Sequence, residues 1–217
     1  MKLHLGCGQR YLEGYVNIDF PSSSHSVQEK SVADLHADIL SLSYSSEIIE
    51  EIRLHHVFEH FPRPIACALL ASWFFWLKHG GLLRIEVPDF QRTARVISSA
   101  FSLIPKRAVA ERHLFGSHEA DWAVHCEGYT PSMLKKMVET FGFRVKEIKK
   151  NSWMGTFNFE LLATKNNKDI SRVAFDNIVS GYLKNYLLDD SASEDRLLEV
   201  WMKKYKKQLE VSWAQDE

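Results

Sequence analysis

The stretch that decides the fold is Leu3-His-Leu-Gly-Cys-Gly8, a short hydrophobic strand that runs directly into two glycines. Glycines at a strand end let the backbone approach a ligand closely, and the amides there can receive polar groups of a cofactor. The dinucleotide fingerprint needs a third glycine where this chain has Tyr11, and an acid about twenty residues further on. Asp19 follows Gly8 by only eleven residues, so a nicotinamide dinucleotide site is disfavoured.

Outward from this stretch, strand and helix patterns alternate. Strands are predicted at about residues 2–5, 15–20, 52–58 and 82–87, and helices at 45–50, 63–78, 90–101 and 131–141. This alternation is typical of an α/β fold with a doubly wound, mostly parallel sheet. Residues 143–150 and 156–164 are predicted to form an antiparallel hairpin at one edge of the sheet.

After residue 165 the pattern changes to two amphipathic helices, at 170–188 and 194–211. The sequence thus predicts a main domain over 1–165 and a helical C-terminal extension over 166–217. The outer face of the last helix carries Lys203, Lys204, Lys206 and Lys207. That face is interpreted as a solvated basic surface, with a lid or a homodimer contact as the alternatives.

Composition excludes several classes of protein. The chain has 217 residues, 45% of them hydrophobic and 25% charged, which is ordinary for a globular domain. Its 27 basic and 28 acidic residues balance, so no global field favours nucleic acid or anionic lipid. Cys7, Cys67 and Cys126 are an odd, sparse set that suits free thiols in a reducing compartment. With no signal peptide or membrane span predicted, a cytoplasmic protein is expected.

Four motifs in order resemble the class I S-adenosylmethionine-dependent methyltransferases. In particular, the chain is similar to the small bacterial branch expected to act in surface-polysaccharide or other glycan biosynthesis. The matching segments are LHLGCG (3–8), GYVNID (14–19), HVFEH (56–60) and LKHGGLLRIEVPD (77–89), the last with His79 where that branch usually has proline. The resemblance covers roughly residues 1–165 and implies a Rossmann-like methyltransferase sheet.

The resemblance also implies a set of cofactor-binding residues. Gly6 and Gly8 would face the methionine part of S-adenosylmethionine, with Cys7 contributing its backbone. Asp19 would accept hydrogen bonds from the ribose hydroxyls, since a carboxylate offers two acceptor oxygens. The residues expected to contact the adenine and the region of the methyl group are Asp38, Ile39, His55 and His56.

Structural alternatives stay open for these positions. Asp19 precedes Pro21 closely and could serve a turn, and Asp38 could cap the turn that follows it. His55 and His56 lie on opposite faces of a strand, so at most one is expected to face the site. Glu59 sits just before a helix start, where it could favour the helix dipole.

An insertion over about 90–128 is expected to shape the acceptor site, because ligands of this fold class bind beyond the strand ends. The candidate substrate-binding residues are His113, His118, Asp121, Trp122 and Tyr129, the two aromatics as stacking surfaces for a sugar ring. His60 and His125 are the candidate general bases. His118, Asp121 and His125 are also residue types that bind divalent ions, but no metal is predicted because their spacing matches no tight ligand motif.

These inferences predict a methyltransferase that methylates a sugar hydroxyl of a glycan precursor or a small metabolite. The alternative is a non-catalytic module of the same fold that acts through a partner. Nucleic-acid methylation is disfavoured because no asparagine-proline-aromatic motif follows the fourth strand, whereas protein methylation stays open. No helix precedes the first strand in this sequence, so residues 90–128 or the C-terminal helices are expected to cover the cofactor.

Overall fold

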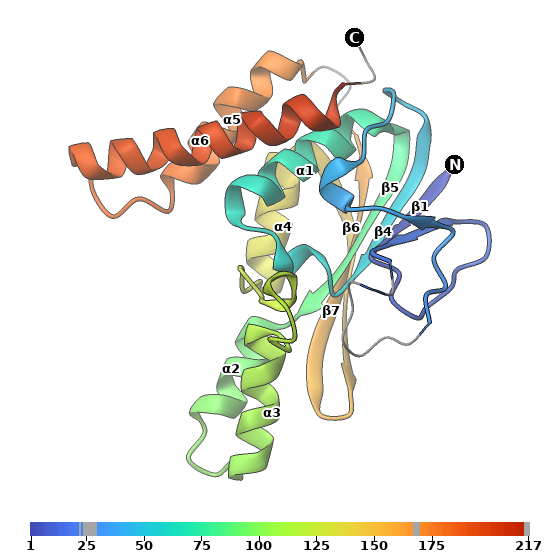
Figure 1. The fold of residues 1–217 in the computed structure, drawn as a ribbon. Coiled ribbons are helices and arrows are strands. Elements are labelled where there is room, and N and C mark those ends of the chain that lie inside the picture. Colours follow the sequence, from blue (N-terminus) through green and yellow to red (C-terminus); the bar gives the residue numbers. More distant parts are fainter. Residues whose placement is uncertain (22, 24–29, 167–169, 215–217) are drawn as a thin grey trace.

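The computed structural model describes residues 1–21, 23, 30–166 and 170–214 (Figure 1). Seven strands form one sheet in the order β3-β2-β1-β4-β5-β7-β6. The strands are β1 (Lys2–Leu5), β2 (Val16–Asp19), β3 (Leu35–His36), β4 (Ile49–His55), β5 (Leu77–Pro88), β6 (Phe143–Trp153) and β7 (Thr156–Lys165). β1 to β5 pair in parallel, and β7 pairs antiparallel with both β5 and β6. The predicted mostly parallel sheet with an antiparallel hairpin at one edge is therefore confirmed.

Six α-helices connect and extend this sheet in the described residues. They are α1 (Arg63–Trp76), α2 (Phe90–Ser98), α3 (Ile104–Phe115), α4 (Pro131–Thr140), α5 (Arg172–Lys184) and α6 (Ala192–Ser212). Short 3-10 turns occur at η2 (Ile39–Ser41), η3 (Phe58–His60) and η4 (Asp121–Ala123). The Thr130 hydroxyl accepts a hydrogen bond from the Met133 amide, which confirms the N-cap expected for α4.

Two local predictions were wrong. The helix expected at 45–50 does not form, because Ile49 already belongs to β4, is fully buried and pairs with Leu77 of β5. The helix expected to continue to residue 78 ends at Trp76, since Leu77 begins β5. In both places burial of an apolar side chain between neighbouring elements overrides the local helical pattern.

One face of the sheet is apolar and carries the core. Leu5, Leu54, Ile85 and Leu161 are aligned across neighbouring strands on this face, and each is fully buried. Helix α1 packs here with almost its whole surface buried, including Trp73 and Phe74. Figure 1 shows α1, α4, α5 and α6 gathered on this side of the sheet.

The opposite face of the sheet is polar. His4, Arg53 and Arg84 are aligned across β1, β4 and β5 on this face. The carboxylate of Glu160 on β7 pairs with both arginines, at 3.2 Å from Arg53 and 3.4 Å from Arg84. A parallel sheet covered by helices on both faces is usually apolar on both. The described residues between β1 and β2 form no helix, which agrees with the polar character of this second face.

The C-terminal helices pack against the sheet domain through the same core. Phe175 of α5 and Tyr205 of α6 are fully buried in the continuous hydrophobic cluster that contains the sheet residues. The side chain of Gln208 donates a 2.7 Å hydrogen bond to the carbonyl of Leu40 in η2. The boundary at residue 165 stays a prediction, because this shared core does not by itself divide the chain.

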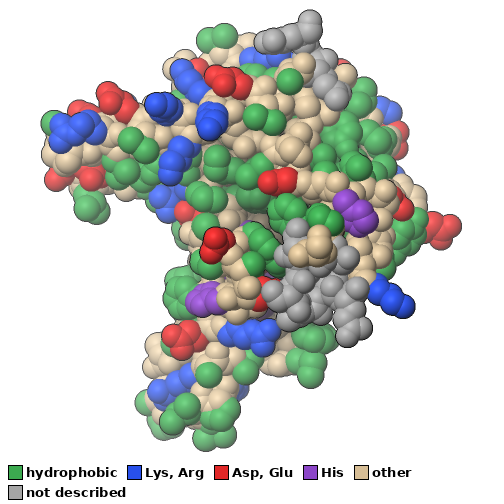
Figure 2. All heavy atoms as spheres, viewed as in Figure 1, with side chains coloured by type: hydrophobic (Ala, Val, Ile, Leu, Met, Phe, Trp, Pro, Cys, Tyr) green, Lys and Arg blue, Asp and Glu red, His purple; other side chains and the backbone are tan. Residues whose placement is uncertain are grey.

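The outer surface of α6 is charged, as predicted. All four lysines of its basic face are exposed, and Lys206 pairs with Asp176 of α5 at 3.3 Å. Figure 2 shows basic and acidic side chains interspersed over this region. A homodimer contact through these helices stays a prediction. Within the described residues, no helix combines the length and apolarity needed to cross a bilayer.

We expect Trp76→Phe to destabilise the attachment of α6. The indole of Trp76 donates to the carbonyl of Ser212 at 3.3 Å, and loss of such a bond costs about 1 kcal/mol. Trp73→Phe is the matched control, because the Trp73 indole is equally buried but donates to no described group. Urea unfolding should give a larger loss for Trp76→Phe than for Trp73→Phe; equal losses would contradict this role.

Candidate functional site

The glycine loop after β1 has the backbone conformation that its sequence requires. Gly6 and Gly8 have φ angles of +66° and +56°, a region that favours glycine. A Cβ on Gly6 would lie 2.2 Å from Val57 Cγ2, whereas a Cβ on Gly8 would meet no atom within 4 Å. The amides of Gly6 and Cys7 both donate to the carbonyl of Ile18, which fixes the loop against β2. Gly6 is thus needed for packing, and Gly8 borders open space.

Asp19 lies beside this loop at the end of β2. Its carboxylate accepts a short hydrogen bond from the Gly8 amide at 2.5 Å and a second from the Phe20 amide at 2.7 Å. The second bond is the local turn interaction considered from the sequence, and the first is a contact between two predicted cofactor residues. The side chain is only 7% exposed, so the structure holds a carboxylate firmly against the glycine loop.

Asp38 and Ile39 follow β3, the next strand of the sheet. The carboxylate of Asp38 is exposed and caps η2 by accepting from the Leu40 amide at 2.8 Å. The capping role is therefore observed, and it uses one of the two carboxylate oxygens. Ile39 is 9% exposed and packs into the core. β2 and β3 lie side by side, so both aspartates stand at the same end of the sheet.

His55, the last residue of β4, and His56, which follows it, face different surroundings, as the alternation of side chains along a strand predicts. His55 joins the polar second face, where its ring nitrogens contact Arg53 at 3.1 Å and His4 at 3.3 Å. Burial lowers the pKa of His55 to about 3, with Arg53 adding to the effect, so the ring is neutral. The predicted cofactor contact of His55 stays a prediction.

His56 instead bridges two carboxylates. Its Nδ1 lies 3.3 Å from Oε1 of Glu59, and its Nε2 lies 3.5 Å from Oε1 of Glu86. Burial alone would lower the pKa of His56, but the two carboxylates outweigh it and raise the pKa to about 10. His56 also has a φ of +54°, which is uncommon outside glycine and places the ring over the site.

Glu59, His60 and His125 come together next to His56. Glu59 is 1% exposed, so its carboxylate lies inside the protein, and its role at the helix dipole stays a prediction. Nε2 of His125 lies 3.9 Å from Oε1 of Glu59, and the rings of His60 and His125 are 4.6 Å apart between centroids. The structure thus brings together the two histidines that the sequence predicts as bases. Glu59 was missed as their partner, although it lies within the HVFEH motif.

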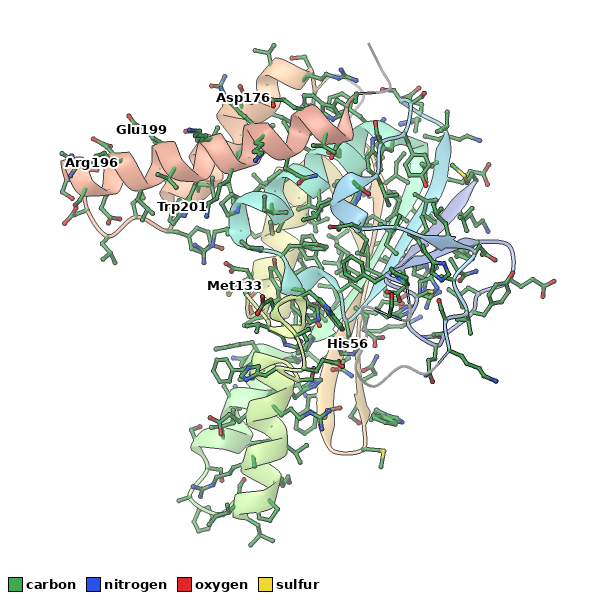
Figure 3. All side chains as sticks on the ribbon, viewed as in Figure 1. His56, Met133, Asp176, Arg196, Glu199 and Trp201 are labelled. Carbon is green, nitrogen blue, oxygen red and sulfur yellow. The ribbon has the colours of Figure 1, made fainter. Side chains whose placement is uncertain are left out.

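A cavity of about 780 Å³ opens beside these groups, between the ends of the central strands and the α2–α3 unit. Figure 3 places His56 at this junction. Its lining combines charged and polar groups with three apolar side chains: His56, Glu86, Val109, Arg112, His113, Gly116, Ser117, His125, Trp153, Met154, Thr156 and Asn158. His113 is held by Asn158, with 2.7 Å between Nε2 and Oδ1.

The predicted acceptor residues divide between this cavity and other places. His113 and His125 line it, which places α3 and the segment after it at the site. His118 and Asp121 are exposed, and His118 bonds the carbonyl of Phe115. Trp122 packs near Phe20, with ring centroids 6.1 Å apart.

Tyr129 is a correction to the predicted acceptor site. It is 5% exposed and stacks on Phe58 in the hydrophobic core, so it is not available to stack on a sugar ring.

The apolar cavity residues Trp153 and Met154, at the tip of the β6–β7 hairpin, were missed. Nothing in their local sequence distinguishes them from ordinary turn residues.

Comparison with solved structures identifies proteins with a similar fold. No family model matches this chain, and no curated protein matches it. A solved S-adenosylmethionine-dependent methyltransferase from Methanosarcina mazei is similar with a TM-score of 0.51 at 15% identity, over 77% of this chain and 92% of that one. Burkholderia thailandensis 1,6-didemethyltoxoflavin-N1-methyltransferase, solved with 1,6-didemethyltoxoflavin and S-adenosylhomocysteine, gives 0.52 at 13%, over 76% and 71%.

A third similar structure is a complex of the Haloferax volcanii Trm112 methyltransferase activator with a methyltransferase. It gives a TM-score of 0.53 at 11% identity, over 78% of this chain and 83% of that one. At such low identities these likenesses establish the fold, a Rossmann-like sheet shared with methyltransferases.

Proposed function

We propose that this protein is an S-adenosylmethionine-dependent methyltransferase. The observation that carries the proposal is the contact between Gly8 and Asp19, which joins the two residues expected to bind opposite ends of the cofactor's ribosyl-methionine part. The fold adds support, since similar solved structures include proteins described as S-adenosylmethionine-dependent methyltransferases.

The residues at the strand ends fit this cofactor. Asp19 and Asp38 offer carboxylate acceptors at neighbouring strands, which suits ribose hydroxyls and an adenine amino group. Ile39 directly follows Asp38 in the chain and offers an apolar side chain. The space beside Gly8 and the strained glycine loop suit a close approach of the methionine part, with Cys7 contributing its backbone. His56, rather than His55, stands nearest to the cavity.

When bound, S-adenosylmethionine supplies an electrophilic methyl group on a sulfonium. The task of the chain is then to align an acceptor with that group at near-attack distance. The cavity beside His56 suits this task, because it adjoins the strand ends and is lined by donors and acceptors such as Arg112, Thr156 and Asn158. Such a lining favours a polar acceptor that carries hydroxyl groups.

We propose O-methylation of a sugar hydroxyl in a glycan precursor or a small metabolite. His60 and His125 would act on the hydroxyl proton, because each ring has its Nδ1 at a backbone carbonyl, which leaves Nε2 as the basic atom. Burial lowers the pKa of His125, so its ring is neutral and able to accept a proton near neutral pH. Trp153 and Met154 offer apolar contact at the rim of the cavity.

A non-catalytic module acting through a partner is the second candidate. The polar second face of the sheet favours it, because the faces of a parallel sheet are usually apolar, whereas His4, Arg53 and Arg84 line this one. One of the similar solved structures is a complex with the Trm112 methyltransferase activator. Cofactor binding without methyl transfer by the isolated chain would favour this candidate.

Methyl transfer to hydroxyl acceptors tests the enzyme proposal. Radiolabelled S-adenosylmethionine would be incubated with the protein and a panel of sugar nucleotides and small polyhydroxy metabolites. We expect His125→Ala to lower the rate with the accepted substrate by about 10²–10⁴-fold, as for loss of a general base or of an equivalent activating group. His118→Ala is the matched control, because this nearby exposed histidine lies outside the cavity lining. Equal rates in the two variants would refute the role of His125.

A further inference from the structure

We propose that Glu59, His60 and His125 form a binding site for a divalent transition-metal ion. One ligand atom from each of these residues lies within 4.8 Å of the others. The set therefore has the size of a coordination shell that needs only small side-chain adjustments to close around an ion. The role given to the ion below rests on the proposed function, but the site itself does not.

The two histidines are oriented as metal ligands. Nδ1 of His60 lies 3.2 Å from the carbonyl oxygen of Val124, and Nδ1 of His125 lies 3.1 Å from that of Leu114. An Nδ1–H that donates to a backbone carbonyl fixes the tautomer and leaves the Nε2 lone pair free. This arrangement is usual for histidines that bind metals.

Glu59 supplies the charge that such an ion needs. It is buried, and neither carboxylate oxygen accepts a hydrogen bond from any described residue. A buried carboxylate without hydrogen bonds is costly, and a bound cation removes that cost. His56 lies 3.3 Å from Oε1 and compensates part of the charge of Glu59, but its other nitrogen faces Glu86. Oε2 of Glu59 accepts no hydrogen bond from a described residue and is the atom left for an ion.

The backbone holds the two halves of the site together. The amides of Cys126 and Glu127 donate to the carbonyl of Glu59 at 2.8 and 3.1 Å. These bonds anchor the segment that carries His125 directly onto the turn that carries Glu59 and His60. The site is therefore built by main-chain contacts and does not depend on surface side chains meeting by chance.

A second group of possible ligands does not make the same case. His55, Glu86 and Glu160 also lie within 4.8 Å of one another. There, however, Glu160 is already paired with Arg53 and Arg84, so its charge is compensated by the protein. An additional cation would compete with two guanidinium groups.

The ligand types indicate which ion binds. Two imidazoles and one carboxylate suit Zn²⁺, Mn²⁺ or Fe²⁺ and leave coordination positions open, whereas Mg²⁺ and Ca²⁺ prefer oxygen ligands. Because His125 lines the cavity, an open position there would face the acceptor. A hydroxyl bound to the ion would lose its proton to solvent more easily, so the ion would activate the acceptor. With their Nε2 atoms bound to the ion, His60 and His125 would then act as ligands, in place of the general-base role proposed above for the metal-free site.

Titration of metal-free protein tests the site. Protein stripped with a chelator would be titrated with Zn²⁺, Mn²⁺ and Mg²⁺ by calorimetry, and Co²⁺ would report the ligand geometry through its visible absorption. We expect one Zn²⁺ or Mn²⁺ per chain, a Co²⁺ spectrum of a site with nitrogen ligands, and much weaker binding of Mg²⁺. Glu59→Gln and His125→Ala should each weaken Zn²⁺ binding at least tenfold, and His118→Ala should leave it unchanged.

The proposal is overturned if the wild type binds no stoichiometric Zn²⁺ or Mn²⁺, or if His125→Ala and His118→Ala bind equally well. His60→Ala serves as a further variant if thermal melting shows that Glu59→Gln does not fold. Titration of the same metal-free protein with S-adenosylhomocysteine separates this proposal from the proposed function. If the protein bound S-adenosylhomocysteine but no Zn²⁺ or Mn²⁺, the metal-site proposal would fail and the methyltransferase proposal would stand.

Discussion

Replacing Asp19 with alanine is expected to lower the affinity for S-adenosylhomocysteine at least tenfold. The proposed ribose hydroxyls would lose their acceptor, and a stranded polar partner costs about 1–3 kcal/mol. The glycine loop would also lose the contact between the Asp19 carboxylate and the Gly8 amide. Calorimetric titration of the variant beside the wild type measures both contributions together.

Asp34→Ala is the matched control for this variant. The exposed carboxylate of Asp34 accepts hydrogen bonds from the backbone and side-chain amides of Asn17, which lies on β2 together with Asp19. We place Asp34 outside the cofactor site. Its affinity for S-adenosylhomocysteine should stay within about twofold of the wild type. If Asp19→Ala bound as tightly as Asp34→Ala, the assigned role of Asp19 would be wrong.

Gly6→Ala is expected to destabilise the fold by about 2–5 kcal/mol. A left-handed conformation costs a non-glycine residue roughly 1–2 kcal/mol, and overpacking typically adds about 1–3 kcal/mol. Both apply here, since φ is +66° and the new methyl group would lie 2.2 Å from Val57 Cγ2. Urea unfolding monitored by circular dichroism gives the change in the free energy of unfolding.

Two further variants separate strain from the clash. Gly8→Ala should cost only the backbone strain, because its methyl group meets no atom within 4 Å. In the double variant Gly6→Ala with Val57→Ala, part of the loss should be recovered, since the clashing methyl groups are gone. An undiminished free energy of unfolding in Gly6→Ala would show that the loop adopts another conformation.

Most of the fold follows from local patterns in the sequence. The strand Lys2–Leu5 stands out because a short hydrophobic run ends there at a glycine. The strand Phe143–Trp153 stands out because apolar residues alternate with polar ones at its start. The antiparallel pairing of β6 with β7 follows from their short turn, whereas the position of β7 rather than β6 beside β5 does not. Ile49 was assigned to a helix because its role depends on Leu77, a partner far along the chain whose position no local pattern gives.

The cofactor half of the site was more predictable than the acceptor half. Gly8 and Asp19 lie at the ends of adjacent parallel strands, so a sheet order alone brings them together. Glu59 and His125 meet because the segment after α3 folds back onto η3, which is a tertiary contact without a sequence signal. An aromatic ring such as that of Tyr129 can stack on a sugar, but in the structure this ring stacks on Phe58 in the core.

Calorimetric titration of the wild-type protein with S-adenosylmethionine and S-adenosylhomocysteine tests the central claim most directly. ATP and a nicotinamide dinucleotide serve as control ligands, because each also offers adenosine to the strand ends. We predict one site per chain with micromolar affinity for both sulfur compounds and much weaker binding of the controls. Absence of binding, or tighter binding of the dinucleotide, would contradict the methyltransferase proposal.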